Sequence, residues 1–176
     1  MSAPELSRPI KPRALPAGTM TIEADEAERA ALARRFGITA IHSLNSEVEF
    51  GEKDGAVLAE GKLAATLEQP CAVTREDFTY KVSETFSLRF VPEGQLGEYE
   101  EDAEFELTEE DLDEIEYEGE TFDLGEAIAQ ELALAIDPYR EGPNADDART
   151  EAGIASDEER TPSGPLAEAL KELRKG

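Results

Sequence analysis

The pattern of apolar and polar residues changes twice along the chain. Four prolines in the first twenty residues predict an extended lead-in over 1–20, with an edge strand around Leu6–Ile10. Asp25 and Glu28 then have the spacing of a capping box. The helix-forming residues after them predict a helix over 25–36, ended by a glycine.

After that glycine the period changes to two, which is typical of strands. Residues 38–50 are rich in β-branched and aromatic side chains, and the charged tip at 51–55 ends in Asp-Gly, a hairpin signal. Apolar side chains alternate with polar ones along 57–67 and again along 80–90. Three long strands joined by short turns favour an antiparallel sheet with one solvated face.

A second helix is predicted over 124–136. Asp123 and Glu126 again have the spacing of a capping box, and Pro138 ends the segment. Between them apolar residues recur at every fourth position: Leu124, Ile128, Leu132 and Ile136.

The C-terminal part of the chain has few hydrophobic residues. Residues 140–164 are rich in Gly, Pro, Ser, Asp and Glu and are predicted to form a disordered linker. Residues 165–175 carry three leucines on one side, which predicts a short amphipathic helix that forms when docked on another surface.

Together these elements predict a single α+β domain over 21–139. Its antiparallel sheet would have about five or six strands, either open or curled toward a barrel. The helices at 25–36 and 124–136 would pack against this sheet. The acidic stretch 98–120 would be a flexible loop inserted between the sheet and the second helix.

Charge narrows the classes of partner. The 176 residues include 42 acidic and 17 basic side chains, a formal net charge of −25. This sign disfavours broad binding to phosphate backbones or to anionic lipid. The chain shows no apolar run long enough to span a membrane, no secretory signal and one cysteine, so we expect a cytoplasmic protein without membrane contact.

The acidic residues are concentrated in the 98–120 stretch, where 14 of the residues are Asp or Glu. Two interpretations stay open: a solvated loop that keeps the protein soluble, or a docking surface for a basic protein. In the second case the candidate contact residues are Glu100, Glu101, Asp102, Glu104, Glu109, Glu110, Asp111, Asp113 and Glu114.

Common catalytic and metal-binding patterns are not matched. His42 and Cys71 are the only histidine and the only cysteine, and both are expected to be ordinary structural residues, with a Cys–His pair as the minor alternative. A calcium loop starting at Asp111 fails at its third ligand and at its glycine. No glycine-rich phosphate loop is present. We therefore expect no enzyme activity, cofactor or metal.

Five segments occur in an order that resembles the bacterial YceD family. They are LSRPI, ADEAERAALARRFG, EQPCAVTREDF, TFDLGEAIAQELALAIDPY and GPLAEALKELRKG. The family is named for large ribosomal RNA subunit accumulation. The resemblance implies a non-enzymatic ribosome-biogenesis factor that supports large-subunit (23S) rRNA synthesis, processing or stability.

The chain departs from the family pattern at two positions. Thr74 stands where many members have the second cysteine of a Cys-x-x-Cys-like pair, and Leu166 stands where an aromatic residue is expected. The C-terminal end is also free of cysteine. A metal site of the family would therefore not transfer to this chain.

Two modes of action remain open. In the first, the acidic surface contacts a basic ribosomal protein or assembly factor, so that contact with large-subunit rRNA is indirect or weak. In the second, a local basic patch near the N-terminus binds RNA directly. Arg34 and Arg35 could instead complement the dipole at the helix C-terminus. The candidate RNA contacts are Arg8, Lys11, Arg13, Arg34 and Arg35, with Arg29 nearby.

Overall fold

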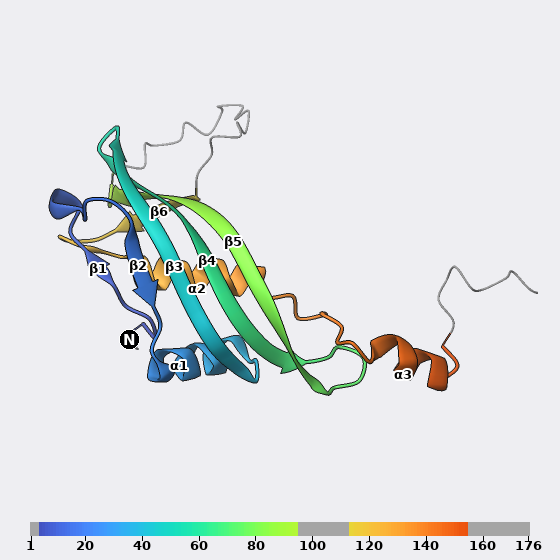
Figure 1. Ribbon diagram of the computed structural model, residues 1–176. Coiled ribbons are helices and arrows are strands. Elements are labelled where there is room, and N and C mark those ends of the chain that lie inside the picture. The colour runs from blue at the N-terminus through green and yellow to red at the C-terminus, as the bar shows by residue number, and fades with distance from the viewer. Residues whose placement is uncertain (1–3, 95–112, 155–176) are drawn as a thin grey trace, which may run out of the picture.

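The computed structural model describes residues 4–94 and 113–154. It contains a five-stranded sheet of order β2-β3-β4-β5-β6 and a two-stranded sheet, β1-β7. Figure 1 shows long, curved central strands with α2 running behind them. The strands are β1 (Pro9–Ile10), β2 (Met20–Glu23), β3 (Ala40–Lys53), β4 (Ala56–Pro70), β5 (Asp77–Pro92), β6 (Asp113–Tyr117) and β7 (Phe122–Asp123).

The first helix, α1 (Glu26–Phe36), begins as the sequence predicts. The Asp25 carboxylate accepts a hydrogen bond from the Glu28 N–H at 2.8 Å, and the Glu28 carboxylate accepts one from the Asp25 N–H at 2.9 Å. At the other end Gly37 has a φ of 67°, a conformation that costs glycine little. The predicted capping box and glycine stop are both confirmed.

The hairpin between β3 and β4 is also confirmed. Asp54 and Gly55 both have positive φ, 51° and 78°, while Lys53 pairs with Ala56. Two such residues form the turn whose twist matches the flanking strands. This turn sets the register of the whole β3–β4 ladder.

The α+β class is confirmed, and the five-stranded sheet is open rather than closed into a barrel. Strands β2 to β5 are antiparallel, whereas β6 runs parallel to β5. β6 lies inside the acidic stretch that the sequence predicts to be a loop, so the loop prediction is wrong for residues 113–117. Ile115 and Tyr117 explain the strand, because these alternating residues pack against the core despite their acidic neighbours.

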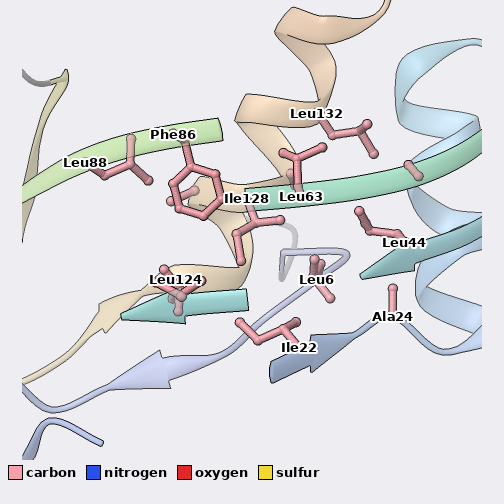
Figure 2. Packing of buried hydrophobic residues seen from close by; sticks show 14 of the residues in the cluster. Leu6, Ile22, Ala24, Leu44, Leu63, Phe86, Leu88, Leu124, Ile128 and Leu132 are labelled. Carbon is pink, nitrogen blue, oxygen red and sulfur yellow. The ribbon is translucent and has the colours of Figure 1, made fainter. Parts of the chain in front are cut away.

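The hydrophobic core lies between the sheet and α2 (Leu124–Ala135). Figure 2 shows Leu63 and Phe86 from the strands gathered with Ile128 and Leu132 from the helix. All four side chains are buried. Burying such side chains is the main favourable term in folding, at roughly 25 cal/mol per Å² of apolar surface.

The N-terminal segment belongs to this core rather than to the edge of the large sheet. Leu6 is fully buried, and the β1 strand pairs with β7. A Cβ at Gly125 of α2 would lie 2.7 Å from the Leu6 carbonyl oxygen and 2.8 Å from the Arg8 nitrogen. Glycine at this position therefore allows the N-terminal backbone to lie directly on the helix.

The disordered-linker prediction fails for residues 140–154. A third helix, α3 (Ala145–Glu151), forms there, and Ala145 is buried. This segment has few hydrophobic residues, and polar contacts attach it to the sheet instead. The Arg140 guanidinium lies 4.2 Å from the Tyr80 ring centre, and the Gly142 N–H donates a hydrogen bond to the Cys71 sulfur. The remainder of the predicted linker and the helix predicted at 165–175 lie outside the described residues.

Candidate functional site

Figure 1 shows the face of the five-stranded sheet that lies away from α2, which we call the open face. The side chains that point to it are mostly polar. Its residues alternate with the buried residues along each strand, as one solvated face requires. Four described Lys and Arg side chains point to it, namely Lys53, Lys62, Lys81 and Arg89. The described carboxylates that point to it from the paired positions of β2, β3, β4 and β6 are Glu23, Glu47, Glu49, Glu60, Glu68, Glu114 and Glu116.

Two of the cations on the open face are neutralised within the sheet. Lys62 forms an ion pair of 2.7 Å with Glu47, and Arg89 forms one of 2.6 Å with Glu114. The Glu47 carboxylate raises the pKa of Lys62 by hydrogen bonding to its ammonium group. Glu68 contacts His42. Within the described part of the chain, the remaining carboxylates of this set have no cationic partner: Glu23, Glu49, Glu60 and Glu116.

Two of these unpaired carboxylates lie directly opposite each other. Glu49 on β3 is the register partner of Glu60 on β4. Like charges at opposed positions destabilise a sheet, because their Cβ atoms lie only about 5 Å apart. The Thr19 hydroxyl donates to the Glu49 carboxylate at 2.8 Å, which satisfies one oxygen without supplying a positive charge. A cation from outside the chain would relieve this repulsion.

Sequence reasoning missed these carboxylates, although the signal was present. The Asp-Gly turn fixes Lys53 opposite Ala56, and counting outward from that pair places Glu47 opposite Lys62 and Glu49 opposite Glu60. The prediction instead assigned the partner-binding surface to the acidic stretch 98–120, where acidic residues are most concentrated.

Most of the acidic contact residues predicted from the sequence lie outside the described part of the chain. Asp113 and Glu114 are on β6, and Glu114 pairs with Arg89. The remaining candidates lie outside the described residues: Glu100, Glu101, Asp102, Glu104, Glu109, Glu110 and Asp111.

Arg8, a candidate RNA contact, is held by acidic and carbonyl oxygens. Its guanidinium donates to both oxygens of the Glu28 carboxylate, at 2.6 and 3.0 Å, and to the Glu23 carbonyl at 3.1 Å. The hydrogen bond from Arg8 lowers the pKa of Glu28 and raises that of Arg8. The charge of Arg8 therefore joins the N-terminal segment to α1.

Arg35 is held in a similar way. Its two terminal nitrogens donate to the Glu126 carboxylate at 2.9 and 2.7 Å, and one of them also donates to Glu5 at 3.0 Å. Glu126 is thereby withdrawn from the predicted second capping box. Only half of that box forms, with the Asp123 carboxylate accepting from the Glu126 N–H.

The structure does not bring the other candidate cations into one patch with these two. Lys11 and Arg13 line a hollow with Tyr117 on the β6 side of the fold. Arg34 lies in the last turn of α1, and lines a different hollow with Arg29, Glu26 and His42. The predicted basic patch is therefore divided among separate places, each containing an acidic residue.

His42 is at an irregular position of β3. The pairing with β4 shifts between Ile41 and Ser43, so His42 is the extra residue of a β-bulge. Its Nε2 lies 2.7 Å from a carboxylate oxygen of Glu68, and half of its side chain is exposed. This contact joins two adjacent strands at the surface.

Cys71 is buried in the turn between β4 and β5. The Thr74 side chain hydrogen-bonds to its sulfur, and backbone N–H groups of Val73, Thr74 and Gly142 do so at 3.2–3.4 Å. These donors stabilise the thiolate and lower the pKa of Cys71 to about 7. The sulfur thus tethers the 137–142 segment to the sheet.

The described residues hold no group of three or more His, Cys, Asp or Glu side chains arranged for a metal ion. None of their helices is long and apolar enough to cross a membrane.

The sequence profile of the family described as "Large ribosomal RNA subunit accumulation protein YceD" matches residues 59–174. This range covers about two thirds of the chain. The chain belongs to the YceD family. The family is named for the accumulation of large-subunit ribosomal RNA, which indicates a role in ribosome biogenesis. No curated protein and no solved structure matches the chain.

The match to the YceD family begins within β4 and continues through β5, β6 and α2. It includes the EQPCAVTREDF segment with Cys71, the TFDLGEAIAQELALAIDPY segment that contains α2, and all but the last two residues of GPLAEALKELRKG. The LSRPI segment and the first helix lie before it. Those N-terminal elements nevertheless complete the core, because Leu6, Ile22 and Leu44 are buried against the matched region.

Proposed function

We propose that the protein is a non-enzymatic ribosome-biogenesis factor that supports large-subunit (23S) rRNA synthesis, processing or stability by holding a basic ribosomal protein or assembly factor. The observation that supports this proposal is the distribution of charge on the described surface. Four carboxylates of the open face have no cation of their own, while Arg8 and Arg35 are already bound to carboxylates. Such a surface complements a cationic protein.

The proposed mechanism is competition for positive charge. The acidic surface would cover the cationic side chains of the partner and prevent their premature contact with other anions. Because RNA carries a much denser line of negative charge, it would displace the acidic surface when the partner reaches its binding site. No covalent step is involved, so the expected signature is affinity that falls steeply with salt.

Affinity capture from lysate tests this proposal. The full chain, immobilised and treated with ribonuclease, should retain a basic ribosomal protein or assembly factor at low salt and release it as salt rises. The double variant Glu49→Gln with Glu60→Gln should retain less. Glu52→Gln with Glu151→Gln removes the same number of charges elsewhere on the described surface and should retain an unchanged amount.

Direct RNA binding is the competing outcome. Retention of a naked large-subunit rRNA fragment by the purified protein at physiological salt, abolished by Arg34→Glu, would replace the proposal with an RNA-binding module. Loss of the basic partner on ribonuclease treatment alone would point the same way.

A further inference from the structure

The β5 strand has a long unpaired edge. It runs from Asp77 to Pro92 and pairs with β4 along almost its whole length, but β6 covers its other side only from Leu88 to Pro92. The part from Thr79 to Thr85 has no strand on that side among the described residues, as Figure 1 shows. We call this part the β5 edge.

The direction of the backbone groups on the β5 edge follows from the hairpin. Lys53 and Ala56 flank a two-residue turn and therefore form a hydrogen-bonded pair. Counting from Ala56, odd-numbered residues of β4 bond to even-numbered residues of β5. The N–H and C=O groups of odd-numbered β5 residues consequently point away from β4. The Glu93 N–H agrees with this count, because it donates to the carbonyl of Tyr117, the last residue of β6.

Four residues of the β5 edge therefore present free backbone groups: Thr79, Lys81, Ser83 and Thr85. All four side chains are exposed, and no backbone hydrogen bond to another described segment involves their edge groups. An unpaired row of this length is a template for an added strand.

Side chains on the α2 side of the β5 edge specify what could be added. Val82 and Phe86 are buried, whereas Glu84 between them is exposed and has no hydrogen-bond or ion-pair partner in the described residues. An added strand would place one side chain opposite Glu84 and two others beside Val82 and Phe86. The favoured pattern is apolar, any residue, Lys or Arg, any residue, apolar, because opposite charges stabilise facing positions.

The net charge of the chain selects between occupants. A second copy would bring another −25 to the same edge, and it would repel the first. A cationic segment of another protein carries the complementary sign. We propose that the β5 edge binds an extended, cationic segment of the basic partner by strand addition, with Lys or Arg opposite Glu84. This inference rests on the proposed function and adds the mode of contact.

Hydrogen exchange on the full chain, with the peptide Thr-Val-Thr-Lys-Thr-Val-Thr as the probe, tests the inference; its terminal threonines avoid placing a cation opposite Lys81. The peptide pattern is symmetric, so it fits a parallel or an antiparallel addition. At ten times its Kd it should slow exchange of the Lys81, Ser83 and Thr85 amides by about tenfold. The matched peptide with Glu at its centre should bind about two- to fivefold more weakly, and Glu84→Lys should reverse that order.

A proline variant separates edge binding from folding. The Ser83 N–H points outward, so Ser83→Pro removes a donor that the β4–β5 ladder does not use, and should abolish peptide binding while thermal unfolding stays cooperative. Unchanged exchange with either peptide, equal binding to Ser83→Pro, or an unreversed order in Glu84→Lys would overturn the inference. Slowing without peptide that grows with protein concentration would assign the edge to a second copy.

The two proposals fail in different ways. If Ser83→Pro still captures the basic partner in the lysate experiment, the edge inference fails and the proposed function stands. If the unaltered chain captures no basic protein, the proposed function fails whatever the peptide does.

Discussion

Arg35 and Glu126 form a two-pronged ion pair that joins the last turn of α1 to the first turn of α2. The two residues are 91 positions apart in the sequence. Parallel hydrogen bonds between guanidinium and carboxylate fix orientation as well as distance. The pair therefore holds two helices that share the core at a defined angle.

Removing the guanidinium of Arg35 should destabilise the fold. Arg35→Ala leaves Glu126 and Glu5 without their cation, and we expect a loss of about 1–2 kcal/mol in the free energy of unfolding. Arg34→Ala, on the neighbouring position with no carboxylate partner in the described residues, should change it by less than about 0.5 kcal/mol. Urea denaturation measures both, and equal losses would show that the ion pair is not responsible.

Acid should weaken the same contacts. Arg35 and Arg8 lower the pKa of Glu126 and Glu28 below the ordinary value of 4.5. The folded state then binds fewer protons than the unfolded state, so the contribution of each pair is fully present above about pH 4.5 and is lost as pH falls through the folded pKa.

One variant tests this predicted loss of stability at low pH. The stability difference between the unaltered chain and Glu126→Gln should be largest near neutral pH and should shrink as pH falls from about 4.5 toward about 3. Glu52→Gln, at the exposed hairpin tip, controls for the change in net charge. A difference that grows on acidification would contradict the assignment of the pKa shift.

Gly61 in β4 should not tolerate a side chain. A Cβ there would lie 2.5 Å from the Glu47 carbonyl oxygen and 2.7 Å from the Phe86 ring. Gly61→Ala should therefore cost about 1–3 kcal/mol through displaced backbone and ring. Gly51→Ala is the matched control, because its Cβ would meet only the Leu58 Cβ at 3.9 Å. Calorimetric melting of both variants distinguishes a steric clash from a general loss of strand propensity.

Reversing one charge of the open face should have opposite effects on stability and on partner capture. Glu60→Lys replaces the repulsion with Glu49 by attraction, which should raise stability by up to about 1 kcal/mol. The same change should weaken capture of the basic protein. Glu52→Lys changes the net charge equally but faces Val57, so it should not raise stability. Unchanged stability in Glu60→Lys would show that the opposed carboxylates do not interact.

The Cys71 thiol should titrate near neutral pH. Its pKa of about 7 is due first to the Thr74 side chain and then to the backbone donors. Thr74→Val should raise the midpoint of the ultraviolet thiolate absorbance, whereas Thr79→Val on the exposed β5 edge should leave it unchanged. An unmoved midpoint in Thr74→Val would mean that the backbone donors alone stabilise the thiolate.

Local signals predicted much of the fold. The capping box at Asp25, the Asp54–Gly55 turn and the alternation along β4 and β5 each depend on residues close in sequence, and each is present in the structure. β6 was missed because its acidic residues resemble those of the preceding stretch, although Ile115 and Tyr117 alternate as strand residues do. Its parallel pairing has no local signal.

Contacts between residues far apart in the sequence were also not predicted. Nothing near Arg8 or Arg35 in the sequence indicates that Glu28 and Glu126 will bind them, so their charges counted as free in the RNA-binding alternative. The pairing of β1 with β7 is equally non-local. The opposed positions of Glu49 and Glu60 were predictable from the hairpin turn. That neither carboxylate has a cationic partner depends on where the described Arg and Lys side chains lie in the fold.

The docking of the Leu6–Arg8 backbone on Gly125 has a consequence for biosynthesis. These first residues leave the translating ribosome long before α2 exists, and their contacts span 115 positions in the case of Arg8 and Asp123. The nascent N-terminal region must therefore wait for nearly the whole domain before it is covered. Closure of the core is a late event in the life of each new chain.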